Sequence, residues 1–164
     1  MKKSTLKLGV LLLAMVFVTG ALFAGAAANQ TVTYEVTAIN EFSVSGDPAA
    51  LTVNAATAGS QPDEVTNAAT TCAITTNGTG KKITGILNTA MPTGVTLKVN
   101  LAAPTGGTSI GDVTLSAVAA DLVTGIATLA ESAKAITYKL SALVTAGVVA
   151  SANKTVTLTI ADGI

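Results

Sequence analysis

The chain has 164 residues, with a single cysteine, no histidine, no tryptophan and an aromatic content of 3%. Nine lysines balance nine acidic residues, and arginine is absent. Without histidine, a catalytic triad of the Ser-His-Asp type and a His-ligated zinc site are both excluded. A single cysteine excludes an internal disulfide, and the lack of arginine and of stacking aromatics argues against nucleic-acid binding.

Residues 1–28 have the pattern of a secretory signal peptide. A positively charged start precedes an almost wholly apolar run over 8–24, and Ala26, Ala27 and Ala28 provide a small-residue cleavage site. We therefore expect a secreted, extracellular or cell-surface protein that begins at Asn29 and has no membrane contact after cleavage. The alternative is an uncleaved anchor, because the apolar run approaches the ~20 residues that a membrane-spanning helix needs.

Cleavage would change the charge of the protein. Lys2, Lys3 and Lys7 leave with the signal, so six lysines face nine acids and the net charge becomes minus three. The mature chain of 164 − 28 = 136 residues is long enough for one domain with its own core, which we place at 29–164. A mildly acidic surface does not favour anionic polymers as partners.

The mature chain alternates apolar and polar residues, with threonine and valine recurring throughout. Both residues are β-branched and favour strands, and strict alternation predicts sheets with one buried and one solvated face. The pattern predicts an all-β fold, a single antiparallel β-sandwich. The expected strands are 30–39, 41–45, 50–54, 70–76, 82–87, 94–101, 122–127, 135–144 and 155–160.

Turn residues separate these runs. Asn77-Gly78, followed by Gly80, predicts a hairpin, and residues 145–154 are expected to join the last two strands as a closing hairpin. Residues 57–66 are the expected long loop. The alanine-rich stretch 116–133 is ambiguous: we favour a strand over 122–127, with a short helical turn over 130–134 as the alternative.

The candidates for chemistry are weak. Gly107 to Gly111 spells G-x-S-x-G, but that nucleophile motif needs a histidine that the chain lacks. Asp63 and Glu64 do not have the spacing of a known calcium loop and are interpreted as solvated charges. Cys72 alternates with threonines and is expected to be a buried small hydrophobe rather than a cross-link between subunits. We expect no enzymatic activity, no cofactor and no metal.

The first expected strand offers another kind of site. Residues 29–40 begin the mature chain and include the amphipathic run QTVTYEVTAI. Such a strand can complete its own sandwich, or it can be donated to the sheet of a neighbouring subunit, which generates a filament when the head-to-tail contact does not close. The candidate donor residues are Val32, Tyr34, Val36 and Ile39.

The C-terminal part of the chain, 121–163, with the phrases AITYKLSA and KTVTLTIAD, resembles small secreted β-sandwich proteins of prokaryotic surfaces. The nearest groups are the TasA-type biofilm matrix fibre subunits, their archaeal bundling-pilus relatives and the spore-coat-U-like pilin domains. The resemblance implies an Ig-like or jelly-roll sandwich and, in the fibre formers, polymerisation by donor-strand complementation.

The leading expectation is therefore a secreted structural subunit of an extracellular filament, pilus or biofilm matrix, whose partner is another copy of itself. One alternative is a monomeric surface module of the same fold that binds a cell-surface component or mediates adhesion. Another is a type-IV-like pilin that is cleaved near Gly9 and keeps its apolar N-terminal helix.

Overall fold

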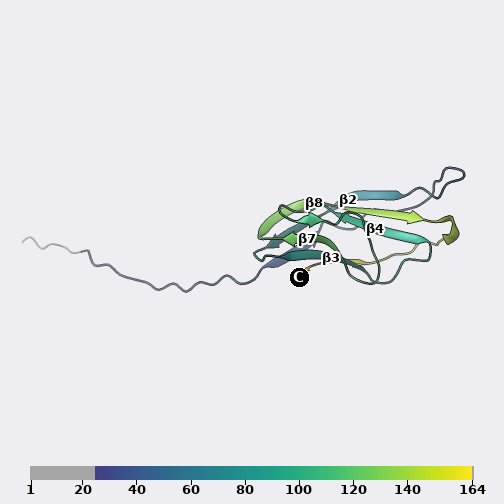
Figure 1. Cartoon of the computed structure of the whole chain (residues 1–164). Helices are drawn as coiled ribbons and strands as arrows, with labels where there is room; N and C mark the ends of the chain where they lie inside the picture. Colours follow the sequence, from purple (N-terminus) through teal and green to yellow (C-terminus); the bar gives the residue numbers. More distant parts are fainter. Residues whose placement is uncertain (1–24, 164) are drawn as a thin grey trace, which may run out of the picture. The chain divides into compact units, whose positions relative to one another are not determined.

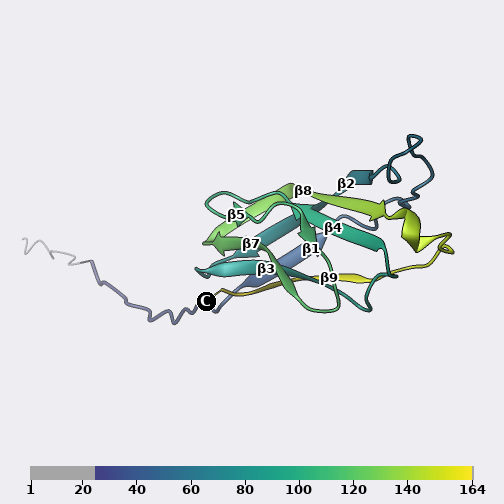
Figure 2. The ribbon, with the colours of Figure 1, turned by 45° about the vertical axis from the view of Figure 1, so that its right-hand side comes forward.

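The computed structural model describes residues 25–163, which divide into two units, one ending at Glu35 and one starting at Val36. The second unit is a β-sandwich of two antiparallel sheets, as the alternating pattern predicts. Figures 1 and 2 show the two layers, with β2, β4 and β8 in one and β3, β7 and β9 in the other. The prediction of an all-β sandwich is confirmed.

The first sheet has the order β1-β2-β8-β4-β6 and the second has the order β5-β7-β3-β9. The bounds in the first sheet are β1 Asn40–Val44, β2 Val65–Thr76, β8 Leu129–Ala142, β4 Val95–Leu101 and β6 Val113–Thr114. Those in the second are β5 Thr108–Ser109, β7 Ala120–Ile126, β3 Lys81–Leu87 and β9 Val156–Asp162. A 3-10 turn, η1 Val144–Ala146, follows β8.

The core lies between the two sheets and is built from the apolar residues of the alternating runs. Cys72 and Ile74 of β2 face inward, as their alternation with threonine predicts, and Ile83 of β3 is fully buried opposite them. The remaining members of the buried cluster are Leu87, Leu97, Val99, Leu101, Leu115, Leu122, Val123, Ile126, Ile136 and Tyr138. Thr70 and Thr76 of β2 are buried beside them, whereas Thr71 and Thr75, on the other face of the same strand, are half-buried and exposed.

Consecutive long strands alternate between the two sheets. β2 lies in the first sheet and β3 in the second, so Asn77-Gly78 connects the sheets and is not the turn of a hairpin. In the same way β8 and β9 belong to different sheets, and β9 pairs with β3. Both hairpin predictions are wrong, because turn residues reverse the chain without specifying whether the next strand pairs with the last or crosses the core.

The expected strands other than 30–39 and 50–54 are confirmed, although β2 and β8 begin five and six residues earlier than expected. Residues 50–54 form no strand, and the nearest pairing is a single bridge between Ala56 and Pro62. The ambiguous stretch is a strand over Ala120–Ile126, as favoured, but residues 130–134 belong to β8 and not to a helical turn. Ala133 has a φ of 56°, a local irregularity that the long β8 absorbs.

Residues 25–39 contain no helix or strand. The expected strand over 30–39 is therefore wrong as an element of the chain's own sandwich. Its apolar side chains are exposed, with Val32 at 77%, Tyr34 at 89% and Val36 at 79% of their full accessible surface. The predicted signal peptide, 1–28, lies mostly outside the described residues. Between residues 25 and 163, the structure contains no helix with the length and apolarity needed to cross a membrane.

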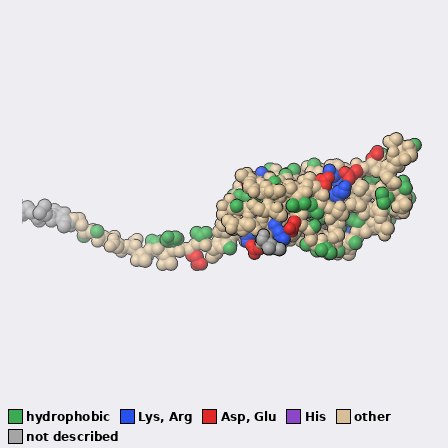
Figure 3. Space-filling view, in the orientation of Figure 1, with side chains coloured by type: hydrophobic (Ala, Val, Ile, Leu, Met, Phe, Trp, Pro, Cys, Tyr) green, Lys and Arg blue, Asp and Glu red, His purple; other side chains and the backbone are tan. Residues whose placement is uncertain are grey.

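Charged side chains are paired across the sandwich surface. Lys98 lies 3.6 Å from Glu64, and Lys139 lies 2.6 Å from Asp112. Lys82 of β3 pairs with Asp121 of β7, its amine 3.1 Å from the carboxylate. In Figure 3 basic and acidic side chains accordingly lie beside one another on the visible face, without a large patch of one sign.

Candidate functional site: an open groove between the sheets

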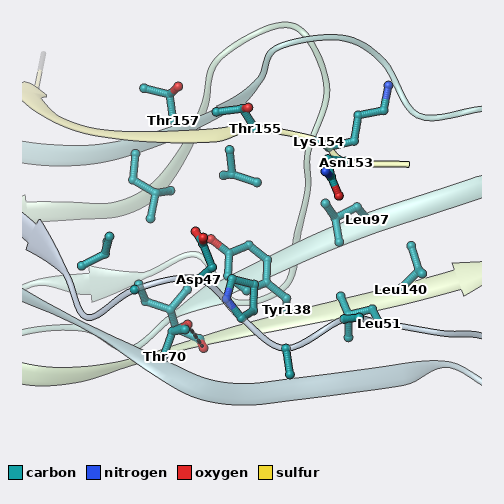
Figure 4. A pocket seen from close by; sticks show the side chains of 18 of the residues that line it. Asp47, Leu51, Thr70, Leu97, Tyr138, Leu140, Asn153, Lys154, Thr155 and Thr157 are labelled. Carbon is teal, nitrogen blue, oxygen red and sulfur yellow. Dashed lines mark hydrogen bonds between the residues drawn. The ribbon is translucent and has the colours of Figure 1, made fainter. Parts of the chain in front are cut away.

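The two sheets leave a groove along one side of the sandwich, between the β1 edge of the first sheet and the β9 edge of the second. Its volume is about 900 Å³. Phe42 to Val44 and the following segment 46–51 form one rim, and residues 152–158 form the other. Inward-facing side chains of β4 and β8, among them Leu97, Tyr138 and Leu140, form the floor (Figure 4). The groove therefore exposes part of the layer that packs as core elsewhere.

The main chain of β9 supplies hydrogen-bonding groups to this groove. At its two ends, Asn88 N–H donates to Thr155 O at 3.0 Å and Gly163 N–H donates to Gly80 O at 2.7 Å. The register with β3 is continuous between them, so odd-numbered residues of β9 bond to β3 and even-numbered ones point the other way. The N–H and C=O groups of Val156 and Leu158 thus face a sheet edge with no paired strand in the described chain.

β9 also lacks the features that usually protect an edge strand. Its sequence VTLTIAD contains no proline and no lysine, and its only charge is Asp162 at the far end. The edge strands β5 and β6 at the other side of the sandwich are two residues long, which limits pairing there. A seven-residue edge whose single charge lies at its far end, beside an open groove, is a template for an added strand.

Tyr138 is the polar residue at the centre of the floor. It is 7% exposed, and its ring packs in the buried cluster. In Figure 4 its hydroxyl lies beside Asp47, which comes from the loop after β1. Burial, together with the negative charge of Asp47, raises the pKa of the Tyr138 phenol. Nearby, the buried Thr70 hydroxyl donates to Ile136 O at 3.4 Å, so this polar group of the floor already has a partner.

The four candidate donor residues fall into two environments. Val32, Tyr34 and Val36 alternate along one face of an extended chain and are exposed. Ile39 is an odd-numbered position, so its side chain would lie on the other face of an extended chain. Its backbone is bonded to the side chain of Asn77, since Ile39 N–H donates to Asn77 Oδ1 at 2.8 Å. The structure thus ties Ile39 to the sandwich, whereas Val32, Tyr34 and Val36 remain available as a continuous apolar face.

The other sequence candidates have structural roles. Cys72 is buried in the core, as expected, and burial raises the pKa of its thiol to about 11. The Ser109 hydroxyl donates to Leu101 O at 2.7 Å and fixes the loop before β6. Within residues 25–163, no three His, Cys, Asp or Glu side chains lie close enough together to hold a metal ion.

The sequence indicated neither the open groove nor that the segment after β1 forms one of its rims. The alternation of Leu51 and Val53 suggested a strand there, whereas this segment forms a rim of the groove. The separation of consecutive strands into different sheets, which leaves β9 at an edge, has no local sequence signal.

No protein-family model, curated protein or solved structure matches this chain.

Proposed function

We propose that this protein is a secreted structural subunit that polymerises by inserting the N-terminal segment of one copy, residues 29–36, into the groove of the next. The observation that carries the proposal is the open groove, lined by both apolar and polar side chains, beside the edge of β9 that has no paired strand within residues 25–163. The extracellular location rests on the signal-like pattern of residues 1–28.

The N-terminal segment has the properties that an added strand requires. Residues 30–36 present Val32, Tyr34 and Val36 on one face, have strand-forming composition and form no strand within the described chain. A strand added to β9 would gain main-chain hydrogen bonds along the ladder and place alternate side chains in the groove. It would also cover the half-buried apolar side chains along the groove, among them Phe42, Leu140 and Leu158.

A second function uses the same groove. About 900 Å³ lies within the range of pockets for small ligands, which usually combine apolar walls with a few polar groups. Tyr138 and Asp47 could supply these groups in a monomeric surface-binding module. The self-donated segment accounts for both the unpaired β9 edge and the exposed apolar face, and a small ligand accounts for neither.

Comparison of the mature chain, 29–164, with a variant that lacks residues 29–36 tests the proposal. The deletion ends before Thr37 because Thr37 and Ile39 are bonded to Asn77 in the sandwich. The buried cluster contains no residue before Cys72, so the variant keeps the whole core. We expect filaments in negative-stain electron microscopy from the mature chain only. Compact monomers from both chains would favour the binding module, and filaments from both would exclude the donated segment.

A further inference from the structure

Resting on this proposed function, we propose that the side chain of Asn77 fixes residues 37–39, the root of the N-terminal segment, in line with β1. Because of this contact, which we call the latch, the segment enters the groove of another copy and lies antiparallel to β9. This inference concerns the direction of assembly, which separates an open filament from a closed monomer or a reciprocal dimer. Two features of the sandwich carry it: the hydrogen bonds of Asn77 and the end at which the groove opens.

The side chain of Asn77 acts as a short continuation of the β1–β2 ladder. Its Nδ2 donates to Thr37 O at 2.8 Å, and its Oδ1 accepts from Ile39 N–H at 2.8 Å. Its own main-chain N–H donates to Ile39 O at 3.2 Å. The Thr76 hydroxyl adds a bond to Asn40 Oδ1 at 2.7 Å. An amide can make both side-chain bonds because it carries a donor and an acceptor.

These bonds oppose a fold-back of the segment into its own groove. Such a fold-back requires a reversal of the chain directly before β1, which would remove Thr37 and Ile39 from their bonds with Asn77. While the latch is formed, the chain before Thr37 therefore continues from the Asn40 end of β1, which we call the root end of the sandwich. The same end holds the contact between Gly80 and Gly163.

The groove opens at the opposite end. Its lining includes Phe42 to Val44 and Val156 to Leu158, but neither Asn40 nor Ile160. The lining continues instead into residues 46–51, which follow β1, and residues 152–155, which precede β9. Both segments lie at the end of the sandwich away from the root end. β1 and β9 also approach each other across the two sheets, and none of the residues at the root end of either strand lines the groove. In Figure 4 Asn153, Lys154, Leu51 and Leu140 lie at the open end.

A segment that enters through the open end must come from another copy. Its residue 36 stays at the open end, next to its own sandwich, and its residue 29 reaches towards the root end. β9 runs from Val156 at the open end to Asp162 at the root end, so the two strands are antiparallel. This contact joins the root of one copy to the open end of the next, and a heterologous contact of this kind propagates as a filament when it does not close.

The positions of the charged residues Lys154 and Glu35 also favour antiparallel entry of the segment. Lys154 lies at the open end, where its amine donates to Thr89 Oγ1 at 2.6 Å and to Ala90 O at 2.7 Å. Antiparallel entry places Glu35 of the incoming segment at this end, where its carboxylate and the ammonium group attract each other. Parallel entry would place Glu35 at the root end, near Asp162.

Disulfide trapping tests the direction in a Cys72→Ala background, which removes the only native thiol. Glu35→Cys with Thr155→Cys, and Thr31→Cys with Thr159→Cys, are the antiparallel pairs. Thr31→Cys with Thr155→Cys, and Glu35→Cys with Thr159→Cys, are the parallel pairs. All four positions are exposed. We expect ladders of cross-linked oligomers, after mild oxidation of preformed filaments, from the antiparallel pairs alone.

The outcomes separate this inference from the proposed function. Cross-links from the parallel pairs, or filaments with no cross-link in any pair, would overturn antiparallel entry while the subunit still polymerises. Failure of the uncross-linked mature chain to polymerise would overturn the proposed function and this inference together.

Substitution of Asn77 tests the latch. We expect Asn77→Ala to raise the concentration needed for polymerisation at least tenfold and to yield closed monomers or dimers that form the parallel disulfides. Asn77→Asp keeps the acceptor for Ile39 N–H but loses the donor to Thr37, so we expect an intermediate effect. Asn54→Ala, at an exposed position, is the matched control. Thermal unfolding identifies any variant that has lost its fold, and unchanged polymerisation of folded Asn77→Ala would overturn the latch.

Discussion

The strongest quantitative prediction concerns the apolar face of the N-terminal segment. The triple variant Val32→Thr, Tyr34→Thr and Val36→Thr places β-branched residues that favour a strand at all three positions. It removes the aromatic ring of Tyr34 and exchanges one methyl group of each valine for a hydroxyl, which is costly to bury. Between 77% and 89% of each side chain is exposed before assembly, so nearly all of this surface is available for burial. Burial of a large apolar side chain contributes about 1.5–3 kcal/mol, and three side chains at the lower end contribute about 5 kcal/mol.

This loss translates into a measurable change in assembly. Since about 1.4 kcal/mol corresponds to a factor of ten in an equilibrium constant, the critical concentration for polymerisation should rise by roughly three to four orders of magnitude. Sedimentation of polymer from a dilution series measures it directly.

The matched control changes the opposite face, with Thr31→Ser, Thr33→Ser and Glu35→Gln. These side chains would remain at the surface of the added strand, so the critical concentration should stay within about tenfold of that of the mature chain, as surface substitutions rarely exceed a small cost. Equal effects of the two triple variants would refute the assignment of Val32, Tyr34 and Val36 as the inserted face.

Three further predictions concern the sandwich itself. Ile83→Ala should reduce the free energy of unfolding by about 2–5 kcal/mol in a denaturant titration, because Ile83 is fully buried between the sheets. The Cys72 thiol, 2% exposed and with its pKa raised to about 11, should react with a thiol reagent only after unfolding; rapid reaction of the native protein would contradict its placement. Hydrogen bonds, first from Lys134 and then from Thr105, lower the pKa of Glu131 from 4.5 to about 2. The ionised Glu131 therefore contributes fully to the free energy of unfolding above pH 4.5, and this contribution is lost as the pH falls towards 2. Glu131→Gln should weaken this acid dependence, as followed by unfolding curves between pH 2 and pH 6.

The fold class could be predicted because alternation directly reports a strand with one buried face. Cys72 and Ile74, and Leu97, Val99 and Leu101, are buried as their spacing requires. Residues 30–36 alternate equally well yet form no strand in the described chain, because alternation shows that a strand can bury one face and does not identify the sheet that receives it.

The groove could not be predicted for a related reason. It exists because β9 pairs with β3 and not with β8, a long-range choice that the linking residues 143–155 do not encode locally. The role of Asn77 was likewise hidden, since Asn77-Gly78 reads as a turn. Its two side-chain bonds to Thr37 and Ile39 depend on a contact across 38 to 40 positions of sequence.

The most direct test of the central claim is whether the groove binds the segment when the two are separate molecules. A synthetic peptide of residues 29–37 can be added to the isotope-labelled variant that lacks residues 29–36, and amide chemical shifts then report the contact residue by residue. We expect saturable binding, with shifts concentrated at Phe42 to Val44, Tyr138 and Val156 to Leu158. Absence of binding, or shifts confined to other surfaces, would contradict the claim that this groove receives the N-terminal segment of a second copy.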